Sequence, residues 1–504
     1  MSESPNILAI QESLEPAMLQ QSPPPHDFLS TVVRNSAFVM GVQVLMKAFG
    51  FLFNIYVVRR LGAEHFGKYA AALAFIAIFA IFSDLGMAPY MLREIARDRK
   101  NTHWLLPNVV VIRLLLSGGV VIVTTAAAYL VGKEADMVLG IFVAACGLFL
   151  YAIQGPLDAT LMGWERLDLS ATFSLVNQVV FWALGALFLI LGWGFIGLLV
   201  ASMLGVAAMA VLEARAVFKE IRFRSLGLTP HRWRELIQAG MPFGISGLAF
   251  SLQGRFDSVL MSVTLTDAIV GWYNVPLQLI TMLMLLAQSV CTSMMPSLTR
   301  AYSQDPRSIH GIVQRSLKYL LLISLPIAVG GAILADRLIV TLYTEEYINA
   351  IPLTRILIWT LPLLFLSELM GALIMALKQE KAGAKINVSN ALLSVVLNLL
   401  MVPTLGVIGA AVARLLARSV RTGQYWHLLG SELLVGQRWK QVLQVGLAAA
   451  VMGLGLFLGR DLNLFLVMGL AGMLYVIALF AFRAIGGEEL QYLISLLLKR
   501  GSQG

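Results

Sequence analysis

Basic side chains lie within long apolar stretches of this chain, and their spacing suggests a binding function. Arg414, Arg418 and Arg421 follow one another at i, i+4 and i+7, which places them on one side of a helix. A guanidinium group binds phosphate or carboxylate through two parallel hydrogen bonds and keeps its proton. The stripe therefore predicts a surface for an anionic ligand.

Other ionisable residues also lie inside apolar stretches, where a charge is costly and marks a functional site by default. The cations predicted to bind the anionic ligand are Lys47, Arg113, Arg255, Arg414 and Arg418. The acids predicted to couple a conformational change to a proton or sodium gradient are Asp84, Asp257 and Glu368. Coupling requires a group that binds the ion differently in two conformations. No organic cofactor and no metal site is expected.

Structural interpretations of the same residues stay open. Arg113 could extend to the membrane interface, Arg421 could lie there, and Asp84 could cap a helix break near Gly86. Arg255 and Asp257 point to different faces of one helix, so either could form a purely structural ion pair with another helix. The polar row Asn387, Asn390, Ser394 and Asn398 faces the interior or forms a helix-helix seam. Trp272 and Tyr273 could stack on sugars or anchor at an interface.

The composition excludes a soluble protein. Of the 504 residues, 58% are hydrophobic and 13% are charged, against about 45–50% and about 25% in soluble domains. Apolar runs of eighteen or more residues recur, each long enough to cross a bilayer as a helix, and the alternation of a transmembrane β-barrel is missing. The net charge of +9 resides in short loops, so no nucleic acid is expected as a partner. Cys146 and Cys291 suggest neither a disulfide nor a zinc site.

The predicted fold class is an all-α polytopic membrane protein with about fourteen transmembrane helices. The spans lie near 36–58, 69–92, 105–130, 136–156, 169–191, 194–217, 235–262, 268–297, 316–334, 353–377, 384–404, 406–429, 440–459 and 463–483. The predicted parts are a cytoplasmic tail (1–33), a six-helix lobe (34–217), a cytoplasmic linker (218–234), a second six-helix lobe (235–429), two additional helices (430–484) and a cytoplasmic tail (485–504). Lys and Arg are more numerous in the loops on the side of the N-terminus, which places both termini in the cytoplasm.

An internal repeat supports the two lobes. Phe66-Gly67-Lys68-Tyr69 has a counterpart in Val270-Gly271-Trp272-Tyr273, and Gly194-Phe195-Ile196-Gly197 has one in Gly406-Val407-Ile408-Gly409. Each unit holds an even number of spans, so the copies enter the membrane in the same direction. Parallel repeats of this kind enclose a site between them, to which rocking gives alternating access.

Particular segments resemble a known family. Arg59 to Tyr69, Asp84-Leu85-Gly86 and Arg93 to Arg97 are similar to the N-terminal signature of bacterial polysaccharide flippases of the O-antigen and exopolysaccharide type. These belong to the multidrug/oligosaccharidyl-lipid/polysaccharide exporter superfamily. The resemblance implies transfer of undecaprenyl-diphosphate-linked oligosaccharides from the cytoplasmic to the outer leaflet by alternating access, with a cationic cavity for the diphosphate. The family has no short invariant motif, so the site residues come from the spans alone.

Related functions remain alternatives: a multidrug-and-toxin-extrusion antiporter, which would favour buried acids over bases, or a lipid II flippase. An enzyme is not expected, because hydrolase and ATPase motifs are missing. The competing enzyme class is a polytopic glycosyltransferase or polymerase acting on lipid-linked sugars, which generally places its catalytic groups in a large external loop. The longest outward loop, 335–352, is short, and its Asp336, Glu345 and Glu346 would merely face solvent. The expected partners are the lipid-linked oligosaccharide, membrane lipids and polysaccharide assembly proteins. The expected location is the inner (plasma) membrane.

Overall fold

The computed structural model describes residues 26–221, 227–304, 308–430 and 439–484. The chain divides into two compact units, Met1–Asn54 and Ile55–Gly504. All residues after Asn54 belong to the second unit. The described residues form helices and no strand, which confirms the all-α fold class, and the protein is a multi-pass membrane protein.

The helices of the first half are α2 (His26–Asp84), α3 (Met87–Arg97), η1 (Arg99–Asn101), α4 (Thr102–Leu130), α5 (Ala135–Gly163), α6 (Leu167–Ile190), α7 (Gly194–Glu220) and η3 (Pro230–Arg232). The second half holds α8 (Trp233–Thr264), α9 (Asp267–Gln304), α10 (Ser308–Ile333), α11 (Ala335–Tyr343), η4 (Glu345–Tyr347), α12 (Ala350–Leu357), α13 (Thr360–Ala376), α14 (Glu380–Leu429), α16 (Trp439–Leu458) and α17 (Leu464–Ala481).

Eleven helices among the described residues are long and apolar enough to cross a membrane. Two of them, α2 and α14, each contain two predicted spans, because Gly62 (φ 74°) and Gly406 (φ 60°) interrupt their helical backbone. A positive φ is favourable only for glycine in most contexts. The predicted span at 235–262 coincides with α8, which is less apolar and is not among the eleven. Each predicted span therefore overlaps a described helix.

Two predicted boundaries are wrong. The span predicted at 69–92 ends at Asp84, because Leu85 and Gly86 adopt positive φ angles of 48° and 76° and a separate helix, α3, begins at Met87. The loop predicted at 335–352 is mostly helical, since it contains α11, η4 and the start of α12. The linker predicted at 218–234 overlaps the end of α7 and the start of α8.

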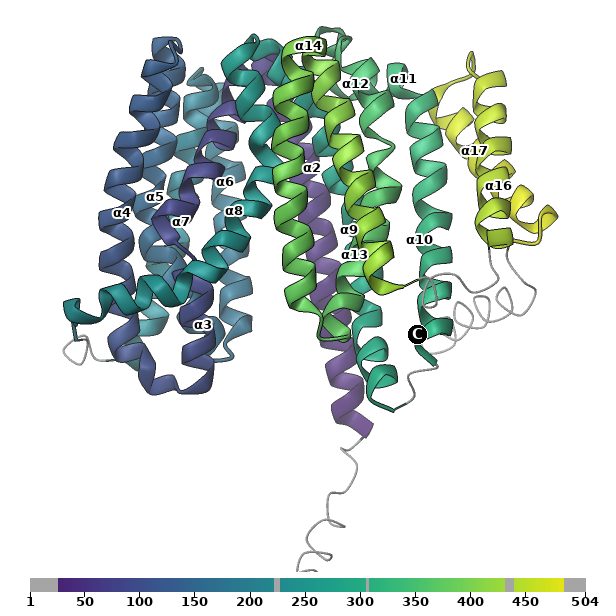
Figure 1. The fold of residues 1–504 in the computed structure, drawn as a ribbon. Helices are drawn as coiled ribbons and strands as arrows, with labels where there is room; N and C mark the ends of the chain where they lie inside the picture. The colour runs from purple at the N-terminus through teal and green to yellow at the C-terminus, as the bar shows by residue number, and fades with distance from the viewer. Residues whose placement is uncertain (1–25, 222–226, 305–307, 431–438, 485–504) are drawn as a thin grey trace, which may run out of the picture. The chain divides into compact units, whose positions relative to one another are not determined.

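Helices α3, α4, α5 and α7 share one apolar core, which we call the first lobe together with α6 and the part of α2 after Gly62 (Figure 1). Helices α9, α12, α13 and α14 pack together as the second lobe. The additional pair α16 and α17 packs on α10, where Met452, Leu456 and Val467 are buried. Apolar burial of this kind contributes about 25 cal/mol per Å².

Helix α8 packs against both lobes. In its first half, Leu236 is buried in the core of the first lobe, and Gly240 and Gly244 touch the backbone at Leu85 and Gly86. A Cβ atom on Gly86 would lie 2.3 Å from the Gly244 nitrogen. The second half of α8 packs along α14. The residues predicted to form a site are thus positioned by a helix that both lobes hold.

Candidate functional site

Asp257 of α8 is the centre of a buried polar cluster between α8, α9 and α14. Its Oδ2 atom accepts hydrogen bonds from the Tyr273 hydroxyl (2.5 Å) and the Arg414 Nε (2.8 Å), and its Oδ1 accepts one from the Ser258 backbone (2.8 Å). The Asp257 residue is only 3% exposed. A buried carboxylate needs such donors and a counter-charge, so the Asp257 charge is fully compensated.

Arg414 is held in place by the same cluster. Its Nη2 donates to the Gly254 carbonyl at 2.8 Å, and its guanidinium lies 5.9 Å from the centre of the Tyr273 ring. Asp257 and Arg414 thus fasten α8 to α14. This arrangement agrees with the structural interpretation of Asp257. Arg414 was predicted to bind the anionic ligand and Asp257 to bind the coupling ion, whereas the structure pairs them with each other.

Arg418 and Arg255 are in a different position. Arg418 is half-buried one turn after Arg414, and Arg255 is exposed two residues before Asp257. Neither guanidinium group forms a hydrogen bond or ion pair with the part of the chain that the structure describes. Like charges at i and i+4 on a helix repel each other. These two guanidinium groups are therefore free to bind an anion, and an anion would relieve the repulsion along α14.

A second polar layer lies one to two turns further along α14. Arg421 donates to Gln253 (3.4 Å) and to the Tyr425 hydroxyl (3.2 Å), and Tyr425 donates to Asn387 Oδ1 at 3.0 Å. Arg421 is thus bound between α8 and α14. Its Nε atom is buried without an acceptor. Arg421 thus adds a third arginine to Arg414 and Arg418, and it contacts α8 through Gln253.

The polar row on the first part of α14 is mainly a helix seam. Asn390 is 1% exposed and donates to the Ala417 carbonyl at 2.7 Å across the helix pair. Gln253 of α8 donates to the Asn387 carbonyl at 2.6 Å. These bonds satisfy backbone carbonyls in an apolar environment and fix the two halves of α14 and α8 in register.

In the first lobe, Arg113 pairs with Asp84 at 3.2 Å. Arg113 is 6% exposed and lies against Gly155 of α5, where a Cβ atom would be 2.4 Å from its Nη1. The interpretation in which Arg113 extends to the interface is therefore wrong. Asp84 also accepts from the Ala88 backbone (3.2 Å), so it caps the break before α3 as well as neutralising Arg113.

Two predicted site residues remain, Lys47 and Glu368. Lys47 is exposed and belongs to the unit Met1–Asn54. Glu368 is half-buried on α13 and forms no ion pair with a described residue. Among the described residues there is also no group of three His, Cys, Asp or Glu side chains able to hold a metal ion.

Sequence reasoning missed the part played by Tyr273. The residue is fully buried and its hydroxyl binds Asp257, so neither the sugar-stacking nor the interfacial interpretation holds for it. The two residues lie sixteen positions apart on successive helices, α8 and α9, so no local pattern in the sequence indicated this hydrogen bond.

A set of contacts joins the two lobes at one end of the second unit, which we call the closed end (residues 62–68, 131–136 and 262–271). Within the first lobe, Lys68 pairs with Glu134 and Asp136, both at 2.7 Å. Between the lobes, Lys133, which precedes α5, pairs with Asp267 of α9 at 3.5 Å. The repeated glycines meet here: a Cβ atom on Gly67 would lie 1.7 Å from the Asp267 carbonyl oxygen, and one on Gly271 would lie 2.2 Å from the Ala63 oxygen.

The segment predicted to be a solvent loop completes the closed end. Glu346 accepts from the Ala63 backbone N–H at 2.6 Å, and the Tyr347 hydroxyl donates to the Val58 carbonyl at 3.0 Å. The Arg59 guanidinium donates to the carbonyls of Thr341 and Leu342. The expectation that Glu346 merely faces solvent is therefore wrong, because this residue binds the backbone beside the Gly62 kink.

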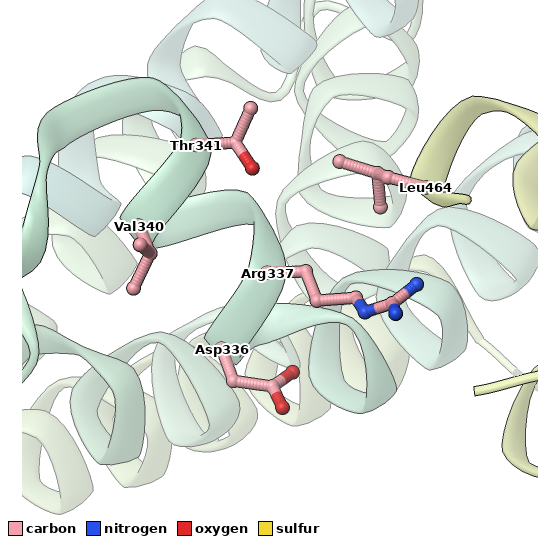
Figure 2. Close-up of a pocket in the computed structure, with 5 residues that line it drawn as sticks. All are labelled: Asp336, Arg337, Val340, Thr341 and Leu464. Carbon is pink, nitrogen blue, oxygen red and sulfur yellow. The ribbon is translucent and has the colours of Figure 1, made fainter. Parts of the chain in front are cut away.

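Figure 2 shows a pocket of about 440 Å³ lined by Asp336, Arg337, Val340, Thr341 and Leu464. Asp336 pairs with Arg460 at 2.8 Å, and Arg337 donates to the Leu462 carbonyl at 2.5 Å. Burial opposes the charged form of Asp336, but the hydrogen bonds from Arg460 and the backbone outweigh it and lower the pKa of this carboxyl. The pocket joins α11 to the turn before α17 and contains none of the predicted binding cations.

The helices, the two lobes and the central polar cluster define a class of multi-pass transporters. The sequence model of the family described as "Polysaccharide biosynthesis protein" matches residues 32–302, which is more than half of the chain, and the chain belongs to this family. The MatE family model also matches, over residues 242–400. The resemblance expected from Arg59 to Arg97 is thereby confirmed.

Two relatives cover most of the chain. One, from Haloferax volcanii, is named as the low-salt glycan biosynthesis flippase Agl15 and is 21% identical, covering 82% of this chain and 86% of its own length. The other, from Shigella flexneri, is named as an O-antigen transporter and is 22% identical, covering 76% of this chain and 94% of its own length.

Two solved structures share the fold. The lipid II flippase MurJ in an inward closed conformation has a TM-score of 0.71 at 13% identity, covering 89% of this chain and 99% of MurJ. A multidrug resistance MATE family transporter in an inward-facing conformation has a TM-score of 0.61 at 16% identity, covering 76% of this chain and 95% of its own.

Proposed function

We propose that the protein is a flippase that moves an undecaprenyl-diphosphate-linked oligosaccharide from the cytoplasmic to the outer leaflet of the inner membrane by alternating access. The observation that carries the proposal is the pair of uncompensated cations, Arg255 and Arg418, beside the neutralised Asp257–Arg414 pair. Guanidinium groups without acidic partners suit a diphosphate. The names of the relatives, a glycan flippase and an O-antigen transporter, agree with this substrate class.

The proposed orientation follows from the loop charges. Arg93, Arg97, Arg99 and Lys100 lie at the end of the second unit opposite the closed end, and basic loops face the cytoplasm. The closed end then faces outward, and both termini are cytoplasmic. In this conformation the lobes are sealed toward the outside, which is the state that accepts substrate from the inner leaflet.

The test measures translocation of a fluorescent undecaprenyl-diphosphate oligosaccharide in proteoliposomes containing the full chain. Arg255→Gln and Arg418→Gln are each expected to lower the rate about tenfold or more, since a hydrogen bond to a charged group is worth about 1.5–3 kcal/mol. Arg355→Gln, which removes an exposed arginine on α12, serves as the control. Unchanged rates in both cluster variants would contradict the proposal.

Two related functions are each favoured by one observation. The fold shared with MurJ favours lipid II as substrate, and the MatE match over 242–400 favours a cationic drug. The same proteoliposomes, supplied with fluorescent lipid II or with a cationic dye, separate these possibilities. Transport of the dye alone would overturn the oligosaccharide proposal in favour of a drug exporter. Arg255 and Arg418 would then repel the transported cation, so they could not be its binding groups.

A further inference from the structure

Helix α7 carries a carboxyl group that the central cluster does not use. Glu213 is 0% exposed and lies deep in the first lobe, packed against α5. Its Oε1 atom accepts one hydrogen bond, from the Gln154 side-chain amide at 3.2 Å. Its Oε2 atom is buried without a partner. Sequence reasoning missed this residue, which lies near the end of the predicted span 194–217.

The groups around Glu213 do not compensate a negative charge. From α5, the neutral Gln154 and the acidic Asp158 face it, and Asp158 itself accepts from Ser170 of α6 at 2.5 Å. No lysine, arginine or histidine in the described ranges lies within ion-pair distance of Glu213.

The nearby cations are occupied or directed elsewhere. Arg113 of α4, which lies beside Gly155 on α5, is paired with Asp84. Arg215 is exposed on another face of α7, since residues two apart on a helix do not face each other. On α6, Asp168 is exposed at the helix start and pairs with Arg166.

An ionised Glu213 would thus be a fully buried anion with one neutral donor and a second acid nearby. Such a charge is strongly unfavourable in a low-dielectric interior, and the group takes up a proton instead. By contrast, Asp84 and Asp257, which were predicted to couple to an ion, each form an ion pair, with Arg113 and Arg414 respectively. Among the described acids of the first lobe, Glu213 is therefore the one that is fully buried and has no cationic partner.

We propose that Glu213 is a proton-binding site in the first lobe, occupied in the conformation closed at residues 62–68 and emptied when the contact between α5 and α7 opens. The inference deepens the proposed flippase function by naming the coupling group, but the protonation state itself does not rest on that function. Proton release must accompany a change at the Gln154 contact, because the ionised form needs water or a new donor.

The first test is infrared difference spectroscopy of the full chain in lipid nanodiscs, stepped from neutral to alkaline pH. The wild type is expected to lose the carbonyl band of a protonated carboxylic acid, and Glu213→Gln is expected to lack that band at every pH. Glu165→Gln, which alters an exposed glutamate, should behave like the wild type. Identical spectra for the wild type and Glu213→Gln would overturn the proposal.

A second measurement needs no variant. Dicyclohexylcarbodiimide is an apolar reagent that adds to protonated carboxyl groups in membranes, and peptide mass spectrometry locates the adduct. Labelling at Glu213 is expected at neutral pH and should fall several-fold on alkalinisation. Labelling that is suppressed by sodium and not by alkaline pH would overturn a proton site in favour of a cation site.

Transport then tests coupling separately. In proteoliposomes, Glu213→Gln should retain translocation without a gradient and lose the several-fold acceleration that an imposed pH gradient gives the wild type. Acceleration equal to that of the wild type would overturn Glu213 as the coupling site. A wild type that moves no oligosaccharide at all, with the infrared and labelling results as expected, would contradict the flippase proposal and leave the protonation site intact.

Discussion

Arg414 and Arg418 lie one turn apart on α14, but only the Arg414 charge is paired with an acidic side chain among the described residues. Arg414 shares a buried hydrogen-bond network with Asp257, and Arg418 forms no ion pair with a described residue. A residue's type and spacing predicted both as ligands. The two arginines differ because Arg414 binds Asp257. That carboxylate lies 157 positions away along the chain, and no local sequence pattern encodes a contact over this separation.

Removing one member of the Asp257–Arg414 pair should destabilise the protein more than removing both. Asp257→Asn leaves a buried guanidinium uncompensated, at a cost of about 3–5 kcal/mol. The double variant Asp257→Asn/Arg414→Met should recover much of the loss, as measured by thermal unfolding in detergent. Asp461→Asn, at an exposed position, provides the control. Additive losses in the double variant would show that the pair is not energetically coupled.

The acids illustrate the limit of sequence reasoning at this scale. Asp84 and Asp257 were predicted as ion-coupling groups because intramembrane acids are costly, and that reasoning applied equally to Glu213. Only the structure shows that the first two have arginine partners and that Glu213 has an amide alone. The cost of burial was predictable from the sequence, whereas the means of compensation was not.

At the scale of elements, the closed end depends on two glycines that occupy corresponding positions in the repeat. Gly67→Ala or Gly271→Ala places a methyl group closer to a backbone oxygen than van der Waals contact allows. Each should shift the protein toward conformations open at this end. Spin labels at Val131 and Val263 should report a longer distance by pulsed electron resonance.

The matched control for these glycines is Gly371→Ala on α13, because a Cβ atom there would have no neighbour within 4 Å. The wild-type distance distribution should persist in this variant. If it also persists in Gly67→Ala and Gly271→Ala, the close approach at the closed end does not determine the conformation.

The contact between α11 and the turn after α16 should respond to acid. Asp336 has a lowered pKa in the folded protein, so its ion pair with Arg460 stabilises the fold above the ordinary carboxyl pKa of about 3.9 and is lost as the pH falls below it. From about pH 6 to about pH 3, the wild type should lose more thermal stability than Asp336→Asn. Equal losses in the two proteins would indicate that the pair contributes nothing.

Secondary structure was the most predictable level. Apolar runs determine membrane helices almost by themselves, since an unsatisfied backbone is excluded from lipid. The errors occurred where tertiary contacts override local pattern. The break at Leu85 and Gly86 is stabilised by Gly240 and Gly244 of α8, and the segment around Glu346 is ordered by its bond to Ala63.

At the scale of the whole molecule, the proposed orientation predicts which residues are accessible from outside. In a variant with Cys146→Ala and Cys291→Ala, a cysteine replacing Val131 at the closed end should react with an impermeant maleimide on intact cells. A cysteine replacing Glu165, at the opposite end, should react only after permeabilisation. Both positions are exposed, so the reverse labelling pattern would place the termini outside.

The two-lobe organisation illustrates what a repeat in the sequence establishes and what it omits. The motifs at Gly67 and Gly271 indicated duplicated units, but not that these glycines contact the opposite lobe. Likewise, the basic stripe on α14 indicated an anion surface, but its relation to α8 required the fold. Contacts between distant segments carry most of the site, and sequence spacing does not specify them.

Helix α8 is clamped at two places, by Gly86 against Gly240 and Gly244 and by Arg414 against Asp257. When the lobes rotate, α8 must bend between these two contacts or lose one of them. Pro242 lies within the first contact, between Gly240 and Gly244, and removes one backbone hydrogen bond from α8 there. Any rotation of one lobe against the other is therefore linked to a bend in α8 or to the loss of one of these two contacts.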